Sequence, residues 1–468
     1  MNKPFIKYTF LVLVLIGTAL SCKITKPYQR PDLNTTDLYR SQTGTDTTTM
    51  ATMPWQNLFA DTTLRALITE GLYQNLNLKV AVQKIVEAQA ALGQNKAAML
   101  PNLSANAGVT HSKQSLASLD YPPGTVVNTI TNTYQLGISA SWEADIWGKL
   151  SSAKKAAFAN LLQTDAAKRA IQTQLIADIA NNYYTLLALD KELEITTQAL
   201  QFRIKEVETM KALKEGAVVN GAAVVQSEAN RYAAEVAIPD IKRSIRETEN
   251  AIDILVGRPS GALNRQKLDG QQPITTLQTG IPAQLLKNRP DVQQAEYNFQ
   301  AAFENTNLAH TYFYPSLTLT ASGGFSNLQL KDFFVNSVFY TLAAGLTQPI
   351  FNQGINKARL TTAIAQQKEA MYNFQQTMLV AGQEVSNALY AYQTAIEKDG
   401  ARTKQIAALV KSVDYTEELL RYSSATNYTD VLTSEQSLLS ARLNGVNDQL
   451  QALQAVVNLY RALGGGWR

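Results

Sequence analysis

The sequence predicts a membrane protein that is mainly α-helical with a few β-strands and that contains one large unit twice. A secretory signal at the N-terminus, segments that recur about two hundred residues apart and two very long helical stretches indicate this class. The 468-residue chain is 45% hydrophobic, which is enough to bury a substantial core. Only 17% of its residues are charged and the net charge of +4 is not clustered, so we expect no nucleic-acid partner.

The N-terminus has the layout of a signal peptide over residues 1–21. A basic region is followed by an apolar run that ends at Leu20 and is too short to span a bilayer. Ser21-Cys22 then forms the cleavage point, and Cys22 is the only cysteine in the chain. This arrangement resembles a bacterial lipobox, so we expect Cys22 to be lipidated and to become the mature N-terminus; a plain cleaved signal is the alternative.

A tandem duplication is visible in three pairs of recurring segments. Pro101-Asn102-Leu103 matches Pro315-Ser316-Leu317, GKLSSAKKAAFA from Gly148 matches GINKARLTTAIA from Gly354, and VVQSE from Val224 matches VLTSE from Val431. The period is too long for a solenoid and indicates that one large unit is repeated. We predict a lipidated leader and connecting segment at 22–60, a first repeat at 61–270 and a second repeat at 271–468.

Each repeat should contain a helix, two strands and a long helical hairpin. Recurring apolar positions predict the first helix from Asp61 to about Leu100. Four segments then alternate apolar with small polar residues, at about 102–113, 131–146, 315–326 and 337–350. Such faces fit the wall of a transmembrane β-barrel, with lipid outside and the lumen inside, although a soluble sandwich is the alternative. Four strands cannot close a barrel, so spanning strands would require several chains in one barrel.

Long helical hairpins are predicted over 151–256 and 356–462, because their outgoing arms contain no proline and hardly a glycine. An arm of about 65 residues would be a rod of roughly 100 Å at the helical rise of about 1.5 Å per residue. Small or helix-breaking residues mark the tips, from Gly216 to Gly221 and from Ser423 to Tyr428. The returning helices should pack antiparallel on these arms.

Arg289-Pro290-Asp291 predicts the start of a helix. Pro290 suits the first turn because its missing N–H would be unpaired there, and Asp291 places negative charge at the positive end of the helix. Asn75-Leu76-Asn77 is a fainter copy that begins the equivalent helix in the first repeat. An ordinary helix start explains the motif without any catalytic role.

No motif indicates an enzyme, so we expect no catalytic residues and no cofactor. His111 and His310 are the only histidines, and they lack the spacing of metal ligands, so no metal site is expected. Gly464-Gly465-Gly466 follows no strand and precedes no helix, which excludes a phosphate-binding loop.

The chain resembles the TolC-like outer-membrane efflux proteins, specifically the lipoproteins that serve resistance-nodulation-division (RND) pumps. The resemblance covers nearly the whole chain and depends on several segments together. These segments are PYQRP after Cys22, SWEADIWGKLSSAKKAA from Ser141, RETENAIDILVGRPSG from Arg246, IPAQLLKNRPDVQQAE from Ile281 with YFYPSLTLTASGGF from Tyr312, QPIFNQG from Gln348 and NYTDVLTSEQSLL from Asn427.

This resemblance implies a homotrimer in which each protomer gives four strands to a twelve-stranded barrel in the outer membrane. A long α-helical barrel would continue it across the periplasm. The tips would close the tunnel at rest and contact a periplasmic adaptor protein, which links the duct to an inner-membrane RND pump. The tip residues in this role would be Gly216, Val219, Asn220, Gly221, Ala425, Thr426, Asn427 and Tyr428.

The narrowest point of such a tunnel should lie near the second tip. Many relatives place an aspartate ring there, whereas Ala425-Thr426-Asn427 carries no carboxylate. We therefore expect polar and aromatic groups to form the constriction, with Asp414, Tyr415, Glu418, Tyr422 and Thr426 as candidates.

The implied function is the exit duct of a tripartite efflux pump, which conducts toxic compounds passively to the exterior. Two alternatives stay open: the outer-membrane duct of a type I protein secretion system, and a periplasmic coiled-coil scaffold lipoprotein. A scaffold would have no use for four amphipathic strands placed symmetrically in two repeats. The lipobox and the PYQRP leader favour export of small molecules or ions over protein secretion.

Overall fold

The structure is a computed structural model that describes residues 24–33, 35, 38–39, 47–118, 128–273, 277–422 and 428–468. The chain divides into two compact units, and each unit combines segments from both halves of the sequence. Unit 1 consists of Met1–Asp32, Ile85–Gln163 and Ala295–Asn373, and unit 2 of Leu33–Lys84, Thr164–Gln294 and Phe374–Arg468. The two sequence repeats are therefore not two separate compact units.

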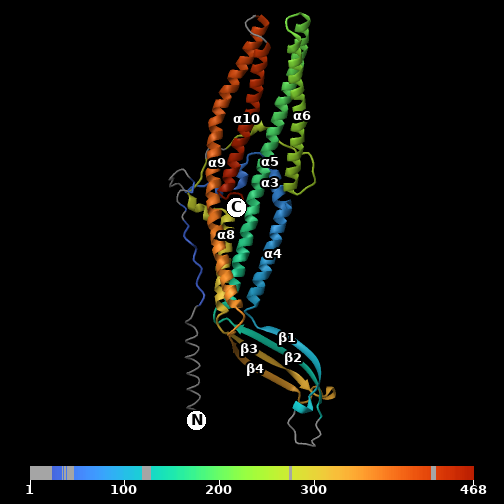
Figure 1. Ribbon diagram of the computed structural model, residues 1–468, viewed down its shortest axis with the longest axis vertical. Helices are drawn as coiled ribbons and strands as arrows, with labels where there is room; N and C mark the ends of the chain where they lie inside the picture. Colours follow the sequence, from blue (N-terminus) through green and yellow to red (C-terminus); the bar gives the residue numbers. More distant parts are fainter. Residues whose placement is uncertain are drawn as a thin grey trace. The chain divides into compact units, whose positions relative to one another are not determined.

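Unit 1 contains an antiparallel four-stranded sheet in the order β1-β2-β3-β4 (Figure 1). The strands are Asn102–Lys113 (β1), Ile130–Ala144 (β2), Ser316–Asn327 (β3) and Val338–Thr347 (β4). Pairing of β2 with β3 joins the two halves of the sequence, since Tyr134 lies opposite Asn327 and Ala144 lies opposite Leu317.

Three of these strands differ slightly from their predicted bounds. β4 ends at Thr347 and not at 350, because Pro349 has no N–H to continue a ladder. β2 ends at Ala144 and not at 146, because the next residue, Asp145, turns its carboxylate to the backbone N–H groups of Leu150 and Ser151. β3 is displaced by one residue, and β1 has the predicted bounds.

The long helices predicted from the absence of proline and the scarcity of glycine are present. They are α5 (Lys149–Glu215) and α9 (Ile355–Tyr422), and the returning helices are α6 (Gly221–Val256) and α10 (Tyr428–Ala462). The remaining helices are α2 (Trp55–Leu58), α3 (Thr62–Gln74), α4 (Leu76–Ala97), α7 (Leu285–Asn288) and α8 (Pro290–Thr311), with short 3-10 turns at Met50–Thr52, Leu116–Ser118, Leu268–Gly270, Pro282–Gln284 and Leu330–Asp332.

The segment predicted to be helical from Asp61 to about Leu100 forms two helices, α3 and α4, separated at Asn75. The apolar periodicity continues across this residue, but the likeness of Asn75-Leu76-Asn77 to the second helix-start motif predicts that a helix begins here. What interrupts the helix is the Asn75 side chain, whose Oδ1 accepts the backbone N–H of Leu78 and thereby caps α4.

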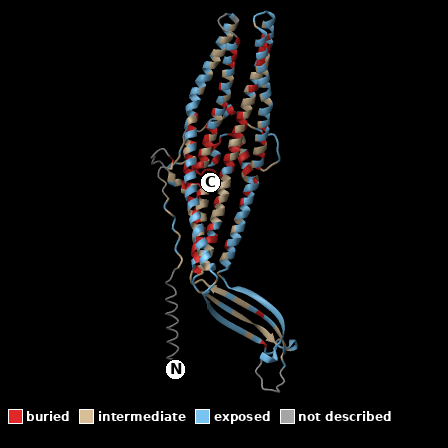
Figure 2. Cartoon of the chain, viewed as in Figure 1, coloured by how far each residue is buried: buried red, intermediate tan, exposed pale blue. Residues whose placement is uncertain are grey.

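The core of unit 2 is built by α3, α5, α6 and α10, and buried residues follow these helices in Figure 2. Completely buried side chains from the four helices are Ile68, Tyr183, Ile252 and Leu459. Asp61 caps α3 through Oδ1 and accepts the Tyr183 hydroxyl through Oδ2 at 2.7 Å. This buried carboxylate is fully hydrogen-bonded, so it fixes the start of α3 on α5 at little cost in desolvation.

No helix in the part of the chain that the structure describes combines the length and the hydropathy needed to cross a membrane.

Candidate functional site

The predicted helix-start motif lies at a junction that occurs once in each repeat. In the first repeat Asn75 precedes α4, and its Nδ2 donates to the carbonyl of Leu255 in the last turn of α6 at 2.8 Å. In the second repeat Arg289 precedes α8, and its Nη1 donates to the carbonyl of Ala462 at the end of α10 at 2.9 Å. Both side chains therefore satisfy a terminal carbonyl of the returning helix of their own repeat.

A glycine closes each junction in the same way. Gly257 follows α6 with φ +80°, and Gly464 follows α10 with φ +88°. A Cβ on Gly257 would lie 2.7 Å from the carbonyl oxygen of Gln74, and a Cβ on Gly464 would lie 2.4 Å from that of Asn288. Only glycine combines this left-handed backbone with so close an approach, so the duplication is preserved in the backbone as well as in the sequence.

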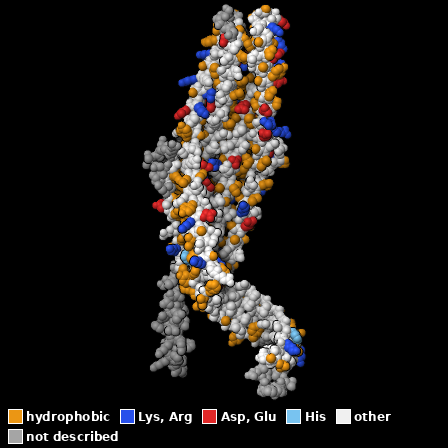
Figure 3. Space-filling view, in the orientation of Figure 1, with side chains coloured by type: hydrophobic (Ala, Val, Ile, Leu, Met, Phe, Trp, Pro, Cys, Tyr) orange, Lys and Arg blue, Asp and Glu red, His pale blue; other side chains and the backbone are white. Residues whose placement is uncertain are grey.

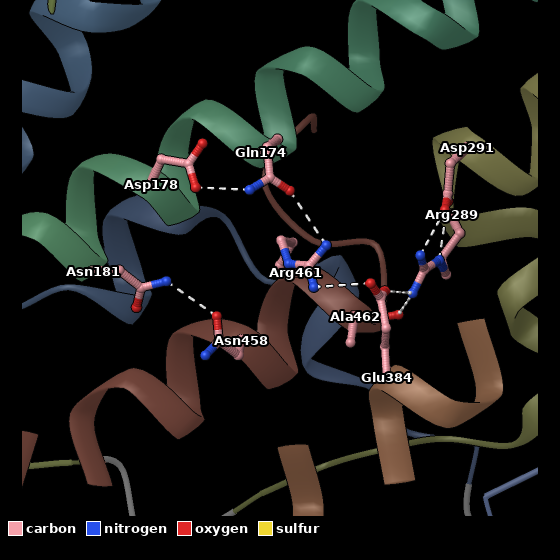
Figure 4. Close-up of polar contacts among 9 residues, drawn as sticks. All are labelled: Gln174, Asp178, Asn181, Arg289, Asp291, Glu384, Asn458, Arg461 and Ala462. Carbon is pink, nitrogen blue, oxygen red and sulfur yellow. Dashed lines mark hydrogen bonds and ion pairs between the residues drawn. The ribbon is translucent and has the colours of Figure 1, made fainter. Parts of the chain in front are cut away.

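The second junction places a buried arginine where the first has Asn75 (Figure 4). Arg289 is only 4% exposed, although α8 begins at Pro290 as predicted. Its guanidinium donates to Asp291 from Nε at 3.0 Å and from Nη2 at 2.6 Å, and to Glu384 of α9 from Nη1 at 2.7 Å. The cation also faces the negative end of α10, which adds to its stabilisation. The motif therefore starts α8 and also supplies the cation of a buried ion network.

The network continues from Glu384 to α5. Arg461 donates to Glu384 from Nη2 at 3.1 Å and to Gln174 from Nη1 at 3.3 Å, and Gln174 donates to Asp178 at 2.7 Å (Figure 4). Burial raises the pKa of the half-buried Asp178 carboxyl. A cavity of about 580 Å³ adjoins these residues and is lined by both helix starts. Neither Glu384 nor Arg461 belongs to a recognisable motif, so sequence reasoning missed them.

The first tip connects α5 to α6 as predicted. Gly216, Val219 and Asn220 lie between the two helices, and Gly221 is the first residue of α6. The Oδ1 of Asn220 accepts the backbone N–H of Ala223 at 3.1 Å and caps α6. Of the second tip, Ala425, Thr426 and Asn427 lie outside the described residues.

Tyr428 does not belong to the exposed tip, which corrects the prediction. It is the first residue of α10 and is only 8% exposed. Its ring packs with Met210 of α5, Val224 of α6 and Leu432 of α10, and its hydroxyl donates to Glu206. A side chain held in this way has little surface left to contact another protein.

A buried charge cluster joins α5 to α10 directly below the tips. Nη1 of Arg203 donates to Glu206 at 2.9 Å and to Glu435 at 2.6 Å, and all three side chains are less than 10% exposed. The guanidinium of Arg203 is thus the shared ion-pair partner of two buried carboxylates. Burial, with the charge of Glu206, raises the pKa of Glu435 to about 7. Arg203 and Glu206 are three residues apart, but Glu435 lies 232 residues from Arg203, so no spacing could have identified the cluster.

The gate candidates in the described part of the chain lie on one side of α9. Asp414, Tyr415, Glu418 and Tyr422 are exposed, with Tyr415 at 63% and Tyr422 at 84%. Their spacing places them within about a third of the circumference of the helix. Thr426 lies outside the described residues.

The leader that follows the predicted lipidation site lies along α8. The backbone N–H and C=O of Lys26 both bond to the Asn307 side chain, at 3.2 and 2.9 Å. The ring of Tyr28 packs on Phe303, with centroids 5.7 Å apart, and Arg30 donates twice to Glu296 at 2.6 Å. These contacts explain the PYQRP motif: a polar leader is held in one extended path. Ser21 and Cys22 themselves lie outside the described residues.

The sheet separates an apolar face from a polar one. The register aligns the alternation on all four strands, so that one face is apolar throughout. Its large side chains are Leu103, Val109, Leu136, Ile138, Trp142, Leu317, Leu319, Phe325, Val338, Tyr340, Leu342 and Leu346. The opposite face carries mainly serine, threonine, asparagine and glycine. Leu342 is 77% and Tyr340 81% exposed, so no residue in the described part of the chain covers the β4 side of the apolar face.

The two histidines are placed apart from any cluster of ligands. His111 lies on β1 and its Nδ1 is 2.6 Å from Oδ1 of Asn132, whereas His310 lies in the last turn of α8. Among the described residues, no three His, Cys, Asp or Glu side chains are grouped so that they could hold a metal ion.

Comparison with known proteins assigns the chain. A family model described as outer membrane efflux protein matches residues 67–258 and 281–465. The chain belongs to this family. The family is one of efflux channels, and the resemblance drawn from the sequence motifs is confirmed.

Individual relatives of this outer membrane efflux protein extend over nearly its full length. The probable outer membrane lipoprotein SilC of Salmonella typhimurium is 27% identical over 420 residues, which cover 88% of each chain. The toluene efflux pump outer membrane protein TtgC of Pseudomonas putida is 28% identical over 475 residues, which cover 100% of this chain and 96% of the relative. The open state of the MtrE outer membrane channel of Neisseria gonorrhoeae has a TM-score of 0.84 at 26% identity, covering 96% of this chain and 99% of that one.

The fold is therefore that of a TolC-like channel, and the protein is an efflux channel of the outer membrane that extends into the periplasm. In an outer-membrane channel, an exposed apolar face of a sheet is the side that contacts lipid.

Proposed function

We propose that three copies of this chain form the exit duct of a tripartite efflux pump, with a periplasmic adaptor protein and an inner-membrane RND pump as partners. The duct conducts toxic small molecules passively and performs no chemistry. The observation that carries this proposal is the sheet, which has one apolar face, one polar face and two open edges. In the described residues β1 and β4 each have one partner strand, and an unpaired edge cannot face lipid. Identical copies that pair β4 with β1 remove both edges.

The leader supports a lipid anchor at Cys22. Thr25 lies against Gly148, where a Cβ would be 3.2 Å from the Thr25 side chain, and Gly148 connects β2 with α5. Cys22 precedes Thr25 by only a few residues, so acyl chains on Cys22 enter the membrane beside the ends of the strands. Replacement Cys22→Ala should abolish incorporation of labelled palmitate while the protein is still exported. Equal labelling of the variant would contradict the anchor.

The exposure of the first tip supports contact with an adaptor. Gly216, Val219 and Asn220, together with Gly221 and with Ala425 to Asn427 of the second tip, form our proposed contact surface; Tyr428 is excluded by its burial. We assign the constriction to Asp414, Tyr415, Glu418 and Tyr422 on α9, and to Thr426, which lies outside the described residues. Their common exposed side is what supports this assignment.

The experiment that tests the duct combines gene deletion with two matched variants on neighbouring positions of β4. Cells without the protein should become sensitive to several unrelated toxic compounds, and the wild-type gene should restore resistance. Leu342→Lys places a charge on the apolar face near the middle of the strand and should cost about 2–4 kcal/mol of membrane stability. Thr341→Lys places the same charge on the polar face and should be tolerated.

We would measure the resistance of the cells, the presence of the protein in the membrane fraction and the dissociation of trimers by heat on gels. We expect Leu342→Lys to lose trimers and resistance, and Thr341→Lys to keep both. Loss of an exported protein with unchanged resistance would indicate a type I secretion duct. A water-soluble protein that needs no detergent would indicate a periplasmic scaffold.

A further inference from the structure

The loop between β3 and β4, residues 328–337, has an unusual surface for a loop at the outer end of a membrane channel. Leu328, Leu330, Phe334 and Val335 are 59%, 65%, 69% and 61% exposed. Loops in water are normally polar, and large apolar side chains gathered on an ordered surface mark an interaction site. Figure 3 shows hydrophobic and basic side chains together at this end of the sheet.

The loop is held in one conformation by Asn327. Its Nδ2 donates to the carbonyls of Asp332 at 2.6 Å and Val335 at 3.3 Å, and its Oδ1 accepts the backbone N–H of Gln329 at 3.1 Å. The amide side chain thus satisfies backbone groups that would otherwise need water. These hydrogen bonds give the loop a defined conformation. The apolar side chains are therefore exposed in an ordered loop.

Three phenylalanine rings fix the direction in which the loop faces. Phe333 and Phe334 lie with their ring centroids 6.2 and 5.2 Å from that of Phe325, and 4.9 Å from each other. Phe325 belongs to the apolar face of the sheet, opposite Val338 of β4 and Leu136 of β2. The loop therefore continues the apolar face beyond the ends of the strands. It does not lie over the polar face.

We infer that this loop is a lipid-binding platform that lies in the outer leaflet of the membrane and contacts acyl chains. Lipid is favoured over a second copy of the chain because the three rings gather on the flat of the sheet, whereas a neighbouring copy would pair along the edge of β4. Lys331 is 78% exposed, and its Nζ lies 3.9 Å from the carboxylate of Asp332. In the proposed position its long side chain would extend to the lipid phosphates. The inference relies on the proposed membrane position of the sheet.

The test places single fluorescent labels on introduced cysteines in the full-length protein reconstituted into vesicles. Phe334→Cys and Val335→Cys report on the loop, Leu342→Cys on the apolar face and Ser322→Cys on the polar face. The parent protein, with Cys22 as its only cysteine, gives the background. Quenching by phosphatidylcholine brominated on its acyl chains is compared with quenching by aqueous iodide.

We expect the loop labels to be quenched by brominated lipid as strongly as the Leu342→Cys label, and several-fold more strongly than the Ser322→Cys label. If only Leu342→Cys is quenched by lipid and the loop labels respond to iodide, the loop lies in water and the inference fails while the duct stands. If the loop labels respond to neither quencher, a neighbouring copy covers them and the inference also fails. If Leu342→Cys itself is not quenched by lipid, the proposed duct fails as well.

Discussion

Replacement of Arg289 by alanine is expected to lower the free energy of unfolding by about 3 kcal/mol, at the low end of the cost of breaking a buried ion pair. The guanidinium is 4% exposed and is the common partner of Asp291, Glu384 and the carbonyl of Ala462. Its loss removes one donor from each of the three. The cost stays at the low end because the two carboxylates remain 38% and 28% exposed, and because Arg461 still pairs with Glu384.

The first repeat offers a matched control. Asn75→Ala removes the equivalent donor to Leu255 and the cap of α4, both made by a neutral amide, and should cost about 1–2 kcal/mol. Arg243→Ala, on a side chain that is 68% exposed, should be neutral. Denaturant unfolding of the detergent-solubilised protein measures all three. Equal costs for Arg289→Ala and Asn75→Ala would show that the buried charge adds nothing to the second junction.

The contact between the hairpins below the tips is expected to weaken as pH rises from about 4.5 to about 7. Burial raises the pKa of Glu435 from its ordinary 4.5 to about 7, so between these values the folded protein holds a proton that the unfolded chain has released. Stability therefore falls with rising pH across this window and is constant above it. A shift of this size corresponds to about 3 kcal/mol.

The physical cause is an excess of negative charge around one cation. Glu435 faces Arg203 and Glu206 of α5 and Glu417 of α9, and Tyr428 of its own helix donates to Glu206. When Glu435 is protonated, Arg203 and Glu206 form a neutral pair. When it ionises, two buried carboxylates share one guanidinium.

Glu435→Gln should remove the pH dependence, because glutamine keeps an oxygen for Arg203 but does not titrate. Hydrogen–deuterium exchange of α10 near Glu435, measured at pH 5 and pH 8 and corrected for intrinsic rates, reports the local opening. We expect faster opening at pH 8 in the wild type and no difference in the variant. Glu397→Gln, at an exposed position on α9, is the control and should behave as the wild type. A variant that still opened faster at pH 8 would exclude Glu435 as the titrating group.

Elements defined by a regular pattern could be predicted from the sequence. The alternation in β1 and the long runs without proline in α5 and α9 gave bounds within a few residues of those observed. The helix start at Pro290 was predictable because proline and an acidic first turn are local signals. These features depend on near neighbours in sequence, which is why a single chain reveals them.

Features that depend on long-range contacts could not be predicted. Tyr428 is buried because it packs with Met210 of α5 and Val224 of α6, and its hydroxyl donates to Glu206. The partners of Arg289 and Arg203 lie as far away as Glu384 and Glu435. From sequence alone, a charged residue in a helical segment is predicted to be exposed to solvent. The buried ion clusters could therefore be identified only from the structure.

The difference between the two helix junctions of each chain limits the symmetry of an assembly built from several copies. One repeat fastens its helices with an uncharged asparagine, and the other with an arginine set between carboxylates. In the proposed trimer, six sites of nearly the same backbone would alternate between an asparagine and an arginine. The wall would approach sixfold symmetry in its backbone but keep only threefold symmetry in the side chains that join its helices.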